Sequence, residues 1–311
     1  MAFSQLLVPI APEQDLNDSH HQAFCFANSC GAKVMLQLVI KELAEYKDIF
    51  HLSGSTLDVL DNATKHYSDA LNQHIQTLHT QYPNIDFSSK ISVGIPYIEI
   101  VKQATQNHAD MIIIDSYRQT KEAACERGSN TLNLMRKSAT PIWSLGKTSP
   151  PVQHVTAAID LTNPDYQEFN SKLVAMAVDF CAQLGAKLTL CHVWKFDSEG
   201  FLRDWSGYSD IEIALLAQKM RDERLSRLNS LLSPYSDRST EIHTLLLEGD
   251  TRTVFPQYIA DNDVDLVVMG SMSRSGIAGF VLGNTAEEMI NQLDCSVITL
   301  KPDSFKSPIH L

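Results

Sequence analysis

The fold is decided by one stretch near the end of the chain, DVDLVVMGSMSRSGIAGFVLGNTAEEM, residues 263–289. An apolar run predicts a buried strand, and the residues that follow Gly283 begin a helix. Four glycines lie between these two elements, interspersed with hydroxyl and amide side chains. A glycine-rich loop between a strand and a helix can gather backbone amides around a phosphate. It can equally serve only as a tight turn that allows close packing of the helix.

The same order of elements occurs twice along the chain, which predicts two βα units, each with a parallel sheet. In the first half we expect strands at 6–11, 32–40, 90–96, 109–117 and 140–145, with helices at 20–29, 56–80, 97–107 and 130–137. In the second half we expect strands at 155–161, 186–194, 239–249, 264–270 and 295–301, with helices at 167–185, 211–232, 252–260 and 285–293.

A fixed offset of 155 residues relates the last third of each half. It carries the run that begins at Asp110 onto the run that begins at Asp265, and Gly128 onto Gly283. Residues 147–153, KTSPPVQ, have the polar and proline-rich composition of a linker. We therefore predict one domain over residues 1–147 and a second over 154–311.

Composition favours a compact soluble protein without a nucleic-acid partner. The chain has 311 residues, 44% of them hydrophobic, and a formal net charge of −12. This acidic balance argues against nucleic acid or an anionic membrane as a partner. No apolar run reaches the roughly 20 residues of a membrane span, and the N-terminus lacks the pattern of a signal peptide. Six cysteines without a CxxC pair favour free thiols, and we expect a cytoplasmic protein.

Each half resembles a universal stress protein domain, and the two together resemble the tandem type of that family. The resemblance rests on the repeated architecture, on GNTAEEMINQLDCSVITLKP (residues 283–302), and on the tail that begins at Lys301. It implies two Rossmann-like domains, each with an open twisted parallel sheet, related by a pseudo-two-fold axis. It also implies a role in stress response and survival.

The resemblance implies a nucleotide site in the second half. The family's nucleotide-binding members carry an aspartate after the first strand, and Gly-x-x-Gly, nine residues, Gly-Ser/Thr after the fourth. Asp160 occupies the aspartate position here, and Val193 the position that lines adenine. The phosphate pattern and its neighbours fall on Gly270, Ser273, Arg274, Gly283, Asn284 and Thr285. Ser273 replaces a glycine and Asn284 replaces Ser/Thr, so binding of ATP with Mg²⁺ and a purely structural loop both stay open.

The first half has lost most of the same pattern. Ala11 stands at the aspartate position, Asp115 at the first glycine and Arg118 at the second, whereas Gly128 and Ser129 match. A carboxylate at the strand end repels phosphate by about 1 kcal/mol or more. We therefore expect no nucleotide in this half, and an ion pair between Asp115 and Arg118.

No other pattern in the sequence indicates catalysis or a resident metal. The chain has no G-x-x-x-x-G-K-[ST] loop and no G-x-S-x-G elbow, and its eleven histidines lack metal-ligand spacing. We therefore predict a non-enzymatic stress-response module that binds a small ligand or a protein partner. Two alternatives stay open: a weak ATP-dependent hydrolase or phosphotransferase, and an apolar ligand held between the two long helices.

The resemblance also predicts how the halves assemble. In universal stress proteins the last strand of one domain pairs with that of its partner across a two-fold axis. The equivalent strands here, TPIWSL (residues 140–145) and CSVITL (residues 295–300), belong to one chain. We expect them to pair with each other and form an intramolecular pseudo-dimer, with further homodimerisation left open.

Overall fold

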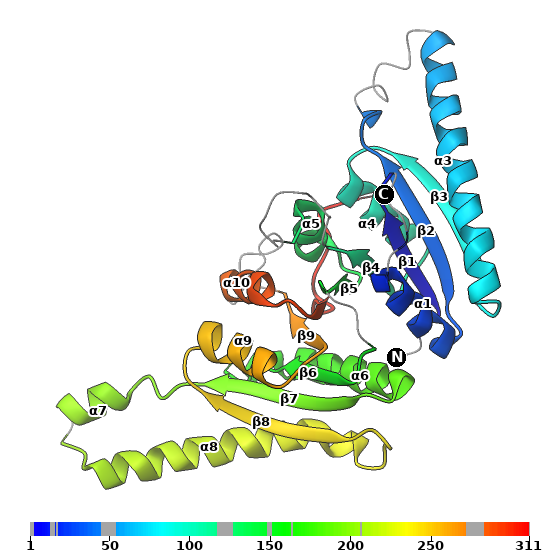
Figure 1. The fold of residues 1–311 in the computed structure, drawn as a ribbon. Helices are drawn as coiled ribbons and strands as arrows, with labels where there is room; N and C mark the ends of the chain where they lie inside the picture. The colour runs from blue at the N-terminus through cyan, green and yellow to red at the C-terminus, as the bar shows by residue number, and fades with distance from the viewer. Residues whose placement is uncertain are drawn as a thin grey trace.

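The structure is a computed structural model that describes residues 3–12, 16, 18–44, 54–116, 127–147, 151–162, 164–205, 207–271 and 283–310. Strands and helices alternate in each half (Figure 1). The first half contains β1 (Gln5–Ile10), α1 (Asp18–Cys30), β2 (Lys33–Ile40), α3 (Gly54–Gln81), β3 (Phe87–Val93), α4 (Pro96–Gln106), β4 (Met111–Asp115), α5 (Ser129–Lys137) and β5 (Ile142–Leu145). The second half contains β6 (His154–Ala158), η1 (Pro164–Tyr166), α6 (Gln167–Leu184), β7 (Lys187–Trp194), α7 (Glu199–Trp205), α8 (Asp210–Leu232), η2 (Ser233–Tyr235), β8 (Ile242–Glu248), α9 (Thr251–Asp261), β9 (Leu266–Gly270), α10 (Asn284–Gln292) and β10 (Ser296–Leu300).

All the strands join in one ten-stranded sheet, in the order β3-β2-β1-β4-β5-β10-β9-β6-β7-β8. The neighbours within each half are parallel. β5 and β10 pair antiparallel, with Trp143 opposite Ile298. The predicted fold class and the predicted pairing of the two last strands are both confirmed. Each last strand covers the edge that the other would otherwise expose.

Two short segments differ from the sequence-based expectation. β3 ends at Val93, not at Pro96, because Gly94 turns the chain with φ +148° and Pro96 already lies in the first turn of α4. Proline suits that position because it has no amide hydrogen to leave unpaired. Helix α7 was not predicted. It has seven residues and too short a pattern to read, and Leu202 packs it against Trp194 and its neighbours.

The two long helices lie at opposite ends of the molecule, which corrects one alternative. α3 packs on the edge strand β3 and α8 on the other edge strand, β8 (Figure 1). The full width of the sheet separates them, so an apolar ligand cannot be held between them. Their apolar stripes belong to the core instead: Leu71 and Leu78 of α3 and Leu228 of α8 are each about 99% or more buried.

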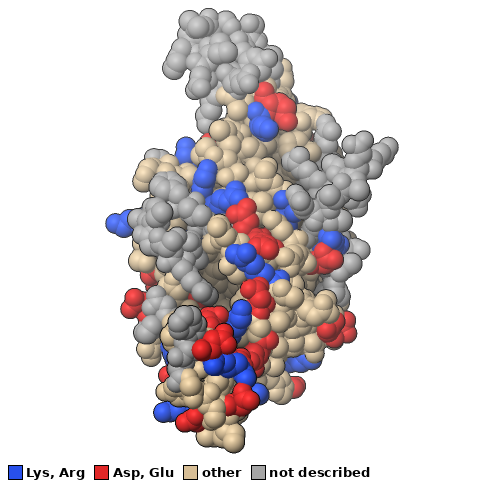
Figure 2. Space-filling view, turned by 90° about the vertical axis from the view of Figure 1, so that its left-hand side faces the viewer, with Lys and Arg blue, Asp and Glu red and all other residues tan. Residues whose placement is uncertain are grey.

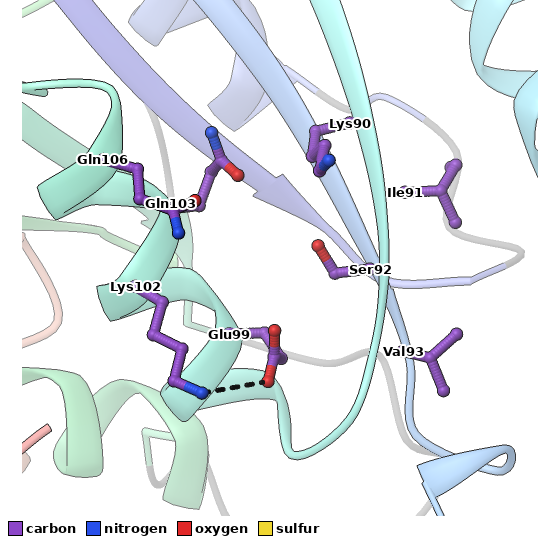
Figure 3. Close-up of a pocket in the computed structure, with 8 residues that line it drawn as sticks. All are labelled: Lys90, Ile91, Ser92, Val93, Glu99, Lys102, Gln103 and Gln106. Atoms are coloured by element: carbon purple, nitrogen blue, oxygen red, sulfur yellow. Dashed lines mark ion pairs between the residues drawn. The ribbon is translucent and has the colours of Figure 1, made fainter. Parts of the chain in front are cut away.

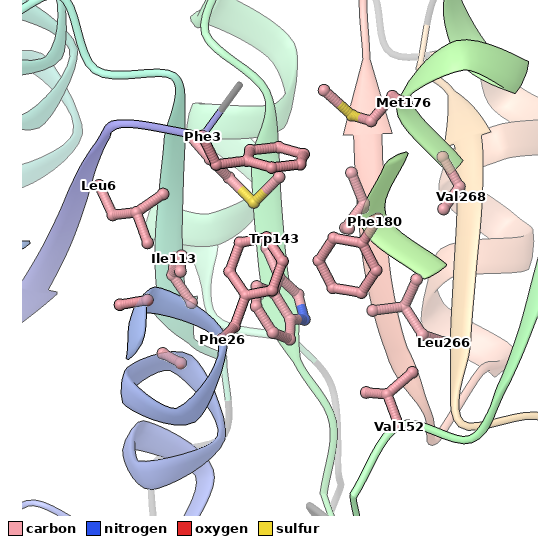
Figure 4. Packing of buried hydrophobic residues seen from close by; sticks show 14 of the residues in the cluster. Phe3, Leu6, Phe26, Ile113, Trp143, Val152, Met176, Phe180, Leu266 and Val268 are labelled. Carbon is pink, nitrogen blue, oxygen red and sulfur yellow. The ribbon is translucent and has the colours of Figure 1, made fainter. Parts of the chain in front are cut away.

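One face of the seam between the halves is filled by aromatic side chains. Phe26 of α1 stacks on Phe180 of α6 with ring centroids 4.5 Å apart, and Trp143 of β5 meets both edge-on (Figure 4). All three side chains are fully buried. Because the three rings come from both halves, the hydrophobic core runs through the seam without interruption.

The halves also repeat one polar contact at the predicted offset. Asp110 accepts hydrogen bonds from the amides of Ser4 and Gln5 at 2.7 and 2.9 Å. Asp265, 155 residues later, accepts hydrogen bonds from the amides of residues 153 and 154 at 2.8 and 2.9 Å. Each aspartate thus fixes the start of the first strand of its own half.

The other face of the seam holds two buried cations, each directed at a helix of the other half. Arg127 Nε donates to the carbonyl of Ile290 in α10 at 3.1 Å. Lys301 Nζ donates to the carbonyl of Met135 in α5 at 2.7 Å, and to the Ser271 hydroxyl at 3.0 Å. The two accepting carbonyls are 155 residues apart and both lie in the last turns of their helices. Cations are favourable there because the last carbonyls of a helix lack partners within it.

Lys301 should make stability depend on pH in a defined direction. Burial lowers the pKa of its ammonium from the usual 10.5 to about 8. Below about pH 8 the ammonium is charged in both the folded and the unfolded chain, so folding must bury the charge at a cost in free energy. Between about pH 8 and about pH 10.5 the group is neutral in the folded chain and still charged in the unfolded chain, so this cost disappears.

We therefore expect the unfolding free energy of the wild type, relative to Lys301→Met, to rise by about 2 kcal/mol between about pH 7 and about pH 9.5. Urea denaturation of both proteins at the two pH values measures this difference. Other titrating groups, such as the buried thiols, are common to both proteins and cancel. If the difference in unfolding free energy between the two proteins stays constant with pH, the pKa of Lys301 is not lowered in the folded chain.

Charges of both signs are mixed on the surface. In the face shown in Figure 2, lysine and arginine side chains alternate with aspartate and glutamate, and the described residues form no continuous basic patch there. Within the described ranges, no helix is long and apolar enough to cross a bilayer.

Candidate functional site

The candidate site of the second half lies where the parallel strands of that half end. β6 lies between β9 and β7 in the sheet. After β6 the chain forms β7 on one side, and it later returns to form β9 on the other side. Ligands of open α/β sheets bind at such a switch point, beyond the carboxyl ends of the strands. Asp160 follows β6, and Gly270 ends β9.

The Asp160 carboxylate is held in place by its own loop. Its Oδ1 accepts from the amide of Thr162 at 2.9 Å and from the Thr162 hydroxyl at 2.5 Å. The backbone carbonyl of Asp160 accepts from Asn170 Nδ2 of α6 at 2.8 Å. The side chain is half-buried. A carboxylate is thus fixed at the strand end, near enough to solvent to face a ligand.

Val193 lies beside this carboxylate, as the sequence predicts. β6 and β7 run in register with Ala158 opposite Cys191, and the amide of Ile159 donates to the Cys191 carbonyl at 2.8 Å. Val193 is two residues further along β7 and half-buried. The structure therefore brings Asp160 and Val193 to neighbouring strand ends.

The glycine loop is anchored at both of its ends. The amide of Gly283 donates to the carbonyl of Ser271 at 3.2 Å, which places the start of α10 beside the end of β9. Gly283 is the N-cap of α10, followed by Asn284, which is exposed, and Thr285, which is half-buried. Because a helix N-terminus presents unpaired amides, this is the anion-binding end of α10. Ser273 and Arg274 lie outside the described residues.

Gly270 also has a packing role that the sequence did not reveal. A β-carbon at this position would lie 2.7 Å from an edge carbon of the Phe169 ring, which comes from α6. The glycine therefore lets the aromatic ring lie directly on the strand end. This contact supports packing, rather than phosphate binding, as the reason for glycine at position 270. It does not bear on the role of Gly283.

Gly270→Ala is expected to lower the free energy of unfolding by about 2 kcal/mol, because the added methyl group overlaps the Phe169 ring. Adding Phe169→Leu should recover part of the loss, since the smaller side chain clears the space. Gly200→Ala is the control, because no described atom lies within 4 Å of the added β-carbon there. Chemical denaturation compares the four proteins. Equal effects at Gly270 and Gly200 would refute the packing role.

The equivalent place in the first half carries different chemistry. Ala11 follows β1, Asp115 ends β4, and Gly128 is the N-cap of α5, with its amide bonded to the Ser116 carbonyl at 3.2 Å. Arg118, the predicted partner of Asp115, lies outside the described residues. The structure instead places Asp115 within electrostatic range of His20, a fully buried residue of α1.

Burial lowers the pKa of His20, while the Asp115 carboxylate opposes that shift. When the two halves are aligned at the starts of their first strands, Gln5 of β1 and His154 of β6, His20 occupies the same position as Phe169. An aromatic ring on a glycine in one half thus corresponds to a histidine near an aspartate in the other. The sequence showed Asp115 but gave no signal that pointed to His20.

His192 was also missed by the sequence reasoning. Its Nδ1 lies 2.9 Å from the Ile159 carbonyl, so this nitrogen carries the hydrogen, and its buried Nε2 has no hydrogen-bond partner. Burial lowers the pKa of the imidazole, and the nearby Asp160 carboxylate opposes the shift. A single histidine inside a strand carries no motif. Within the described residues no cluster of three metal-ligating side chains forms.

With this geometry in place, the chain can be compared with known proteins. The model of the universal stress protein family matches residues 152–301, which run from β6 through β10. The second half of the chain thus matches the universal stress protein family. The match contains the end of β6, the glycine loop and α10.

The likeness to curated universal stress proteins extends over both halves. The chain is 26% identical to universal stress protein E of Photorhabdus laumondii, over 99% of this chain and 98% of that protein. It is 22% identical to universal stress protein E of Escherichia coli K12, over 99% and 97%. The sequence similarity therefore spans both halves of this chain and nearly the full length of these relatives.

Solved structures share the complete fold. A universal stress protein from Archaeoglobus fulgidus superimposes with a TM-score of 0.63 at 17% identity, covering 97% of this chain and 99% of that one. A structure from Pseudomonas aeruginosa UCBPP-PA14 gives 0.71 at 18% identity, covering 97% and 94%. At these identities the likeness concerns the fold alone. The site of this protein must be argued from its own residues.

Proposed function

We propose that the chain is a non-enzymatic stress-response module that binds ATP with Mg²⁺ once per chain, in the second half. The proposed stress role rests on the similarity to universal stress proteins over both halves. The observation that carries the binding proposal is the difference between the halves at equivalent positions. The second half has Asp160 and Gly270 where the first has Ala11 and Asp115.

The feature of the site that best fits a nucleotide is the N-terminus of α10. α10 begins after a glycine N-cap, and among the described residues no side chain caps its first amides. Triphosphate oxygens accept hydrogen bonds from such amides. Asp160 and the backbone at Val193 would face the nucleoside end, and Asp160 is the carboxylate available to Mg²⁺. Gly270 to Ser273 and Gly283 to Thr285 would face the phosphates, with Arg274 as the nearby cation.

Calorimetric titration of Mg-ATP into the purified chain tests this proposal. We expect one site per chain and weaker binding for Asp160→Ala, with Asp115→Ala in the first half as the matched control. Analysis of the titrated sample for ADP tests the non-enzymatic role. No binding at millimolar ATP would contradict the nucleotide site, and hydrolysis above that of a Gly283→Asp control would contradict the non-enzymatic role.

A further inference from the structure

A cavity of about 260 Å³ opens in the first half, between the edge strand β3 and helix α4 (Figure 3). It is remote from the strand ends that form the candidate nucleotide site. Its lining residues are Lys90, Ile91, Ser92, Val93, Glu99, Lys102, Gln103 and Gln106. Lys90 and Ser92 point to the α4 side of the strand, whereas Ile91 and Val93 point to the other side (Figure 3).

The polar groups of the cavity are mostly hydrogen-bond donors. Lys90 has no carboxylate partner among the described residues, and Lys102 Nζ lies 3.9 Å from Glu99 Oε1, the outer limit of an ion pair. Ser92 Oγ accepts from Gln37 Nε2 at 3.2 Å, which leaves the Ser92 hydroxyl hydrogen to donate elsewhere. The cavity lining thus contains two ammonium groups and one free hydroxyl hydrogen, but a single carboxylate. Together these groups favour an anion.

The second half provides an internal comparison for this cavity. Gly94 turns the chain after β3, and a β-carbon there would lie 2.9 Å from the Glu99 side chain. Gly249 turns the chain after β8, and its β-carbon would lie 2.7 Å from Val254. Both pairs are related by the offset of 155. β3 with α4 and β8 with α9 are therefore the same unit, residue for residue.

At the same offset, the second half has apolar residues where the first half has polar ones. Leu245 stands for Lys90, Leu247 for Ser92 and Tyr258 for Gln103. Those three second-half residues pack against the hydrophobic core on that face of the sheet. The fold therefore does not require lysine, serine or glutamine at these positions.

The floor beneath Ser92 in the first half is polar as well. Gln37 is fully buried and donates from Nε2 to Ser92 Oγ and to the Glu99 carbonyl, both at 3.2 Å. Its Oε1 has no hydrogen-bond partner among the described residues. Burial of an amide costs free energy unless the amide is hydrogen-bonded, and the two bonds of Nε2 hold Ser92 and Glu99 in the cavity wall.

From this contrast we propose that the β3–α4 cavity binds a small polar molecule through a carboxylate or phosphate group. Lys90 and Lys102 hold the anionic oxygens from opposite walls, and the Ser92 hydroxyl donates between them. Charge-assisted hydrogen bonds of this kind are shorter and stronger than those between neutral groups. The first half thus has a ligand site of its own, distinct from the nucleotide position that its sequence has lost.

Nuclear magnetic resonance titration of the full chain with inorganic phosphate, and separately with succinate, tests this site. We expect saturable shifts at the amides of residues 90–93 and 99–106, and the tighter of the two probes identifies the preferred anion. Lys90→Leu and Lys102→Gln copy the residues of the second half, so the fold should tolerate both. Each should raise the dissociation constant about tenfold, the effect of losing one charge-assisted hydrogen bond.

Lys33→Gln is the matched control, because Lys33 belongs to the neighbouring strand but pairs at the surface with Asp86 at 3.2 Å. It should leave the dissociation constants unchanged. Equal affinities in the wild type and in both cavity variants would overturn the proposal. So would shifts that grow linearly with phosphate, succinate and chloride alike at equal ionic strength.

Discussion

Replacing Arg127 with methionine is expected to lower the free energy of unfolding by about 4 kcal/mol. The guanidinium is 3% exposed and donates across the seam to the carbonyls of Ile290, Leu293 and Cys295, at 2.9–3.1 Å. It also donates to the Ser144 hydroxyl of its own half. Methionine fills much of the space but leaves these buried acceptors without their donor. Each such loss costs about 1–3 kcal/mol.

Arg136→Met is the matched control for this experiment. Arg136 also joins the two halves, through an ion pair with Glu287, but both side chains are about 30% exposed. We expect a loss of less than about 1 kcal/mol, because solvent screens such pairs. Urea denaturation followed by circular dichroism measures both variants. A small and equal loss in the two proteins would show that the buried guanidinium does not stabilise the seam.

The seam itself could be predicted from the sequence, whereas the groups that stabilise it could not. The offset of 155 made the strands at 142–145 and 296–300 equivalent, and the resemblance to universal stress proteins implied that such last strands pair across a two-fold axis. Arg127 and Lys301 gave no such signal. Each cation is directed at a helix that lies more than 150 residues away in the sequence. Such contacts depend on tertiary packing, which local patterns do not encode.

The candidate site was predictable to a similar degree. The positions of Asp160, Val193, Gly270 and Gly283 at strand and helix ends followed from carrying the pattern of the resembled family onto this sequence. The side chains that cover the strand ends did not follow. Phe169 on Gly270, and His20 near Asp115, depend on which turn of a preceding helix lies over the sheet. The incorrect alternative of an apolar ligand between the two long helices has the same origin, because an apolar stripe on a helix does not indicate which element packs against it.

Gly283→Asp is expected to weaken ATP binding by at least about a hundredfold while preserving the fold. Gly283 has φ −58° and ψ 133°, a conformation open to any L-residue. Aspartate is a favoured N-cap, so α10 should become more stable. Its carboxylate would take up the first amides of the helix and place a negative charge where the phosphates would bind. Loss of binding would then be an electrostatic effect rather than a failure to fold.

Gly128→Asp in the first half supplies the control, since the same change there should leave ATP binding unaltered. Gly128 is the equivalent N-cap, with φ −59° and ψ 148°, and among the described residues an added β-carbon would meet only the Ser116 carbonyl, at 3.7 Å. Ser273→Gly should tighten binding, because glycine restores the backbone freedom of the family motif. Calorimetric titration of Mg-ATP compares these three variants with the wild type. If Ser273→Gly binds no better, and neither it nor the wild type binds at millimolar ATP, the loop serves only to pack α10 against the sheet.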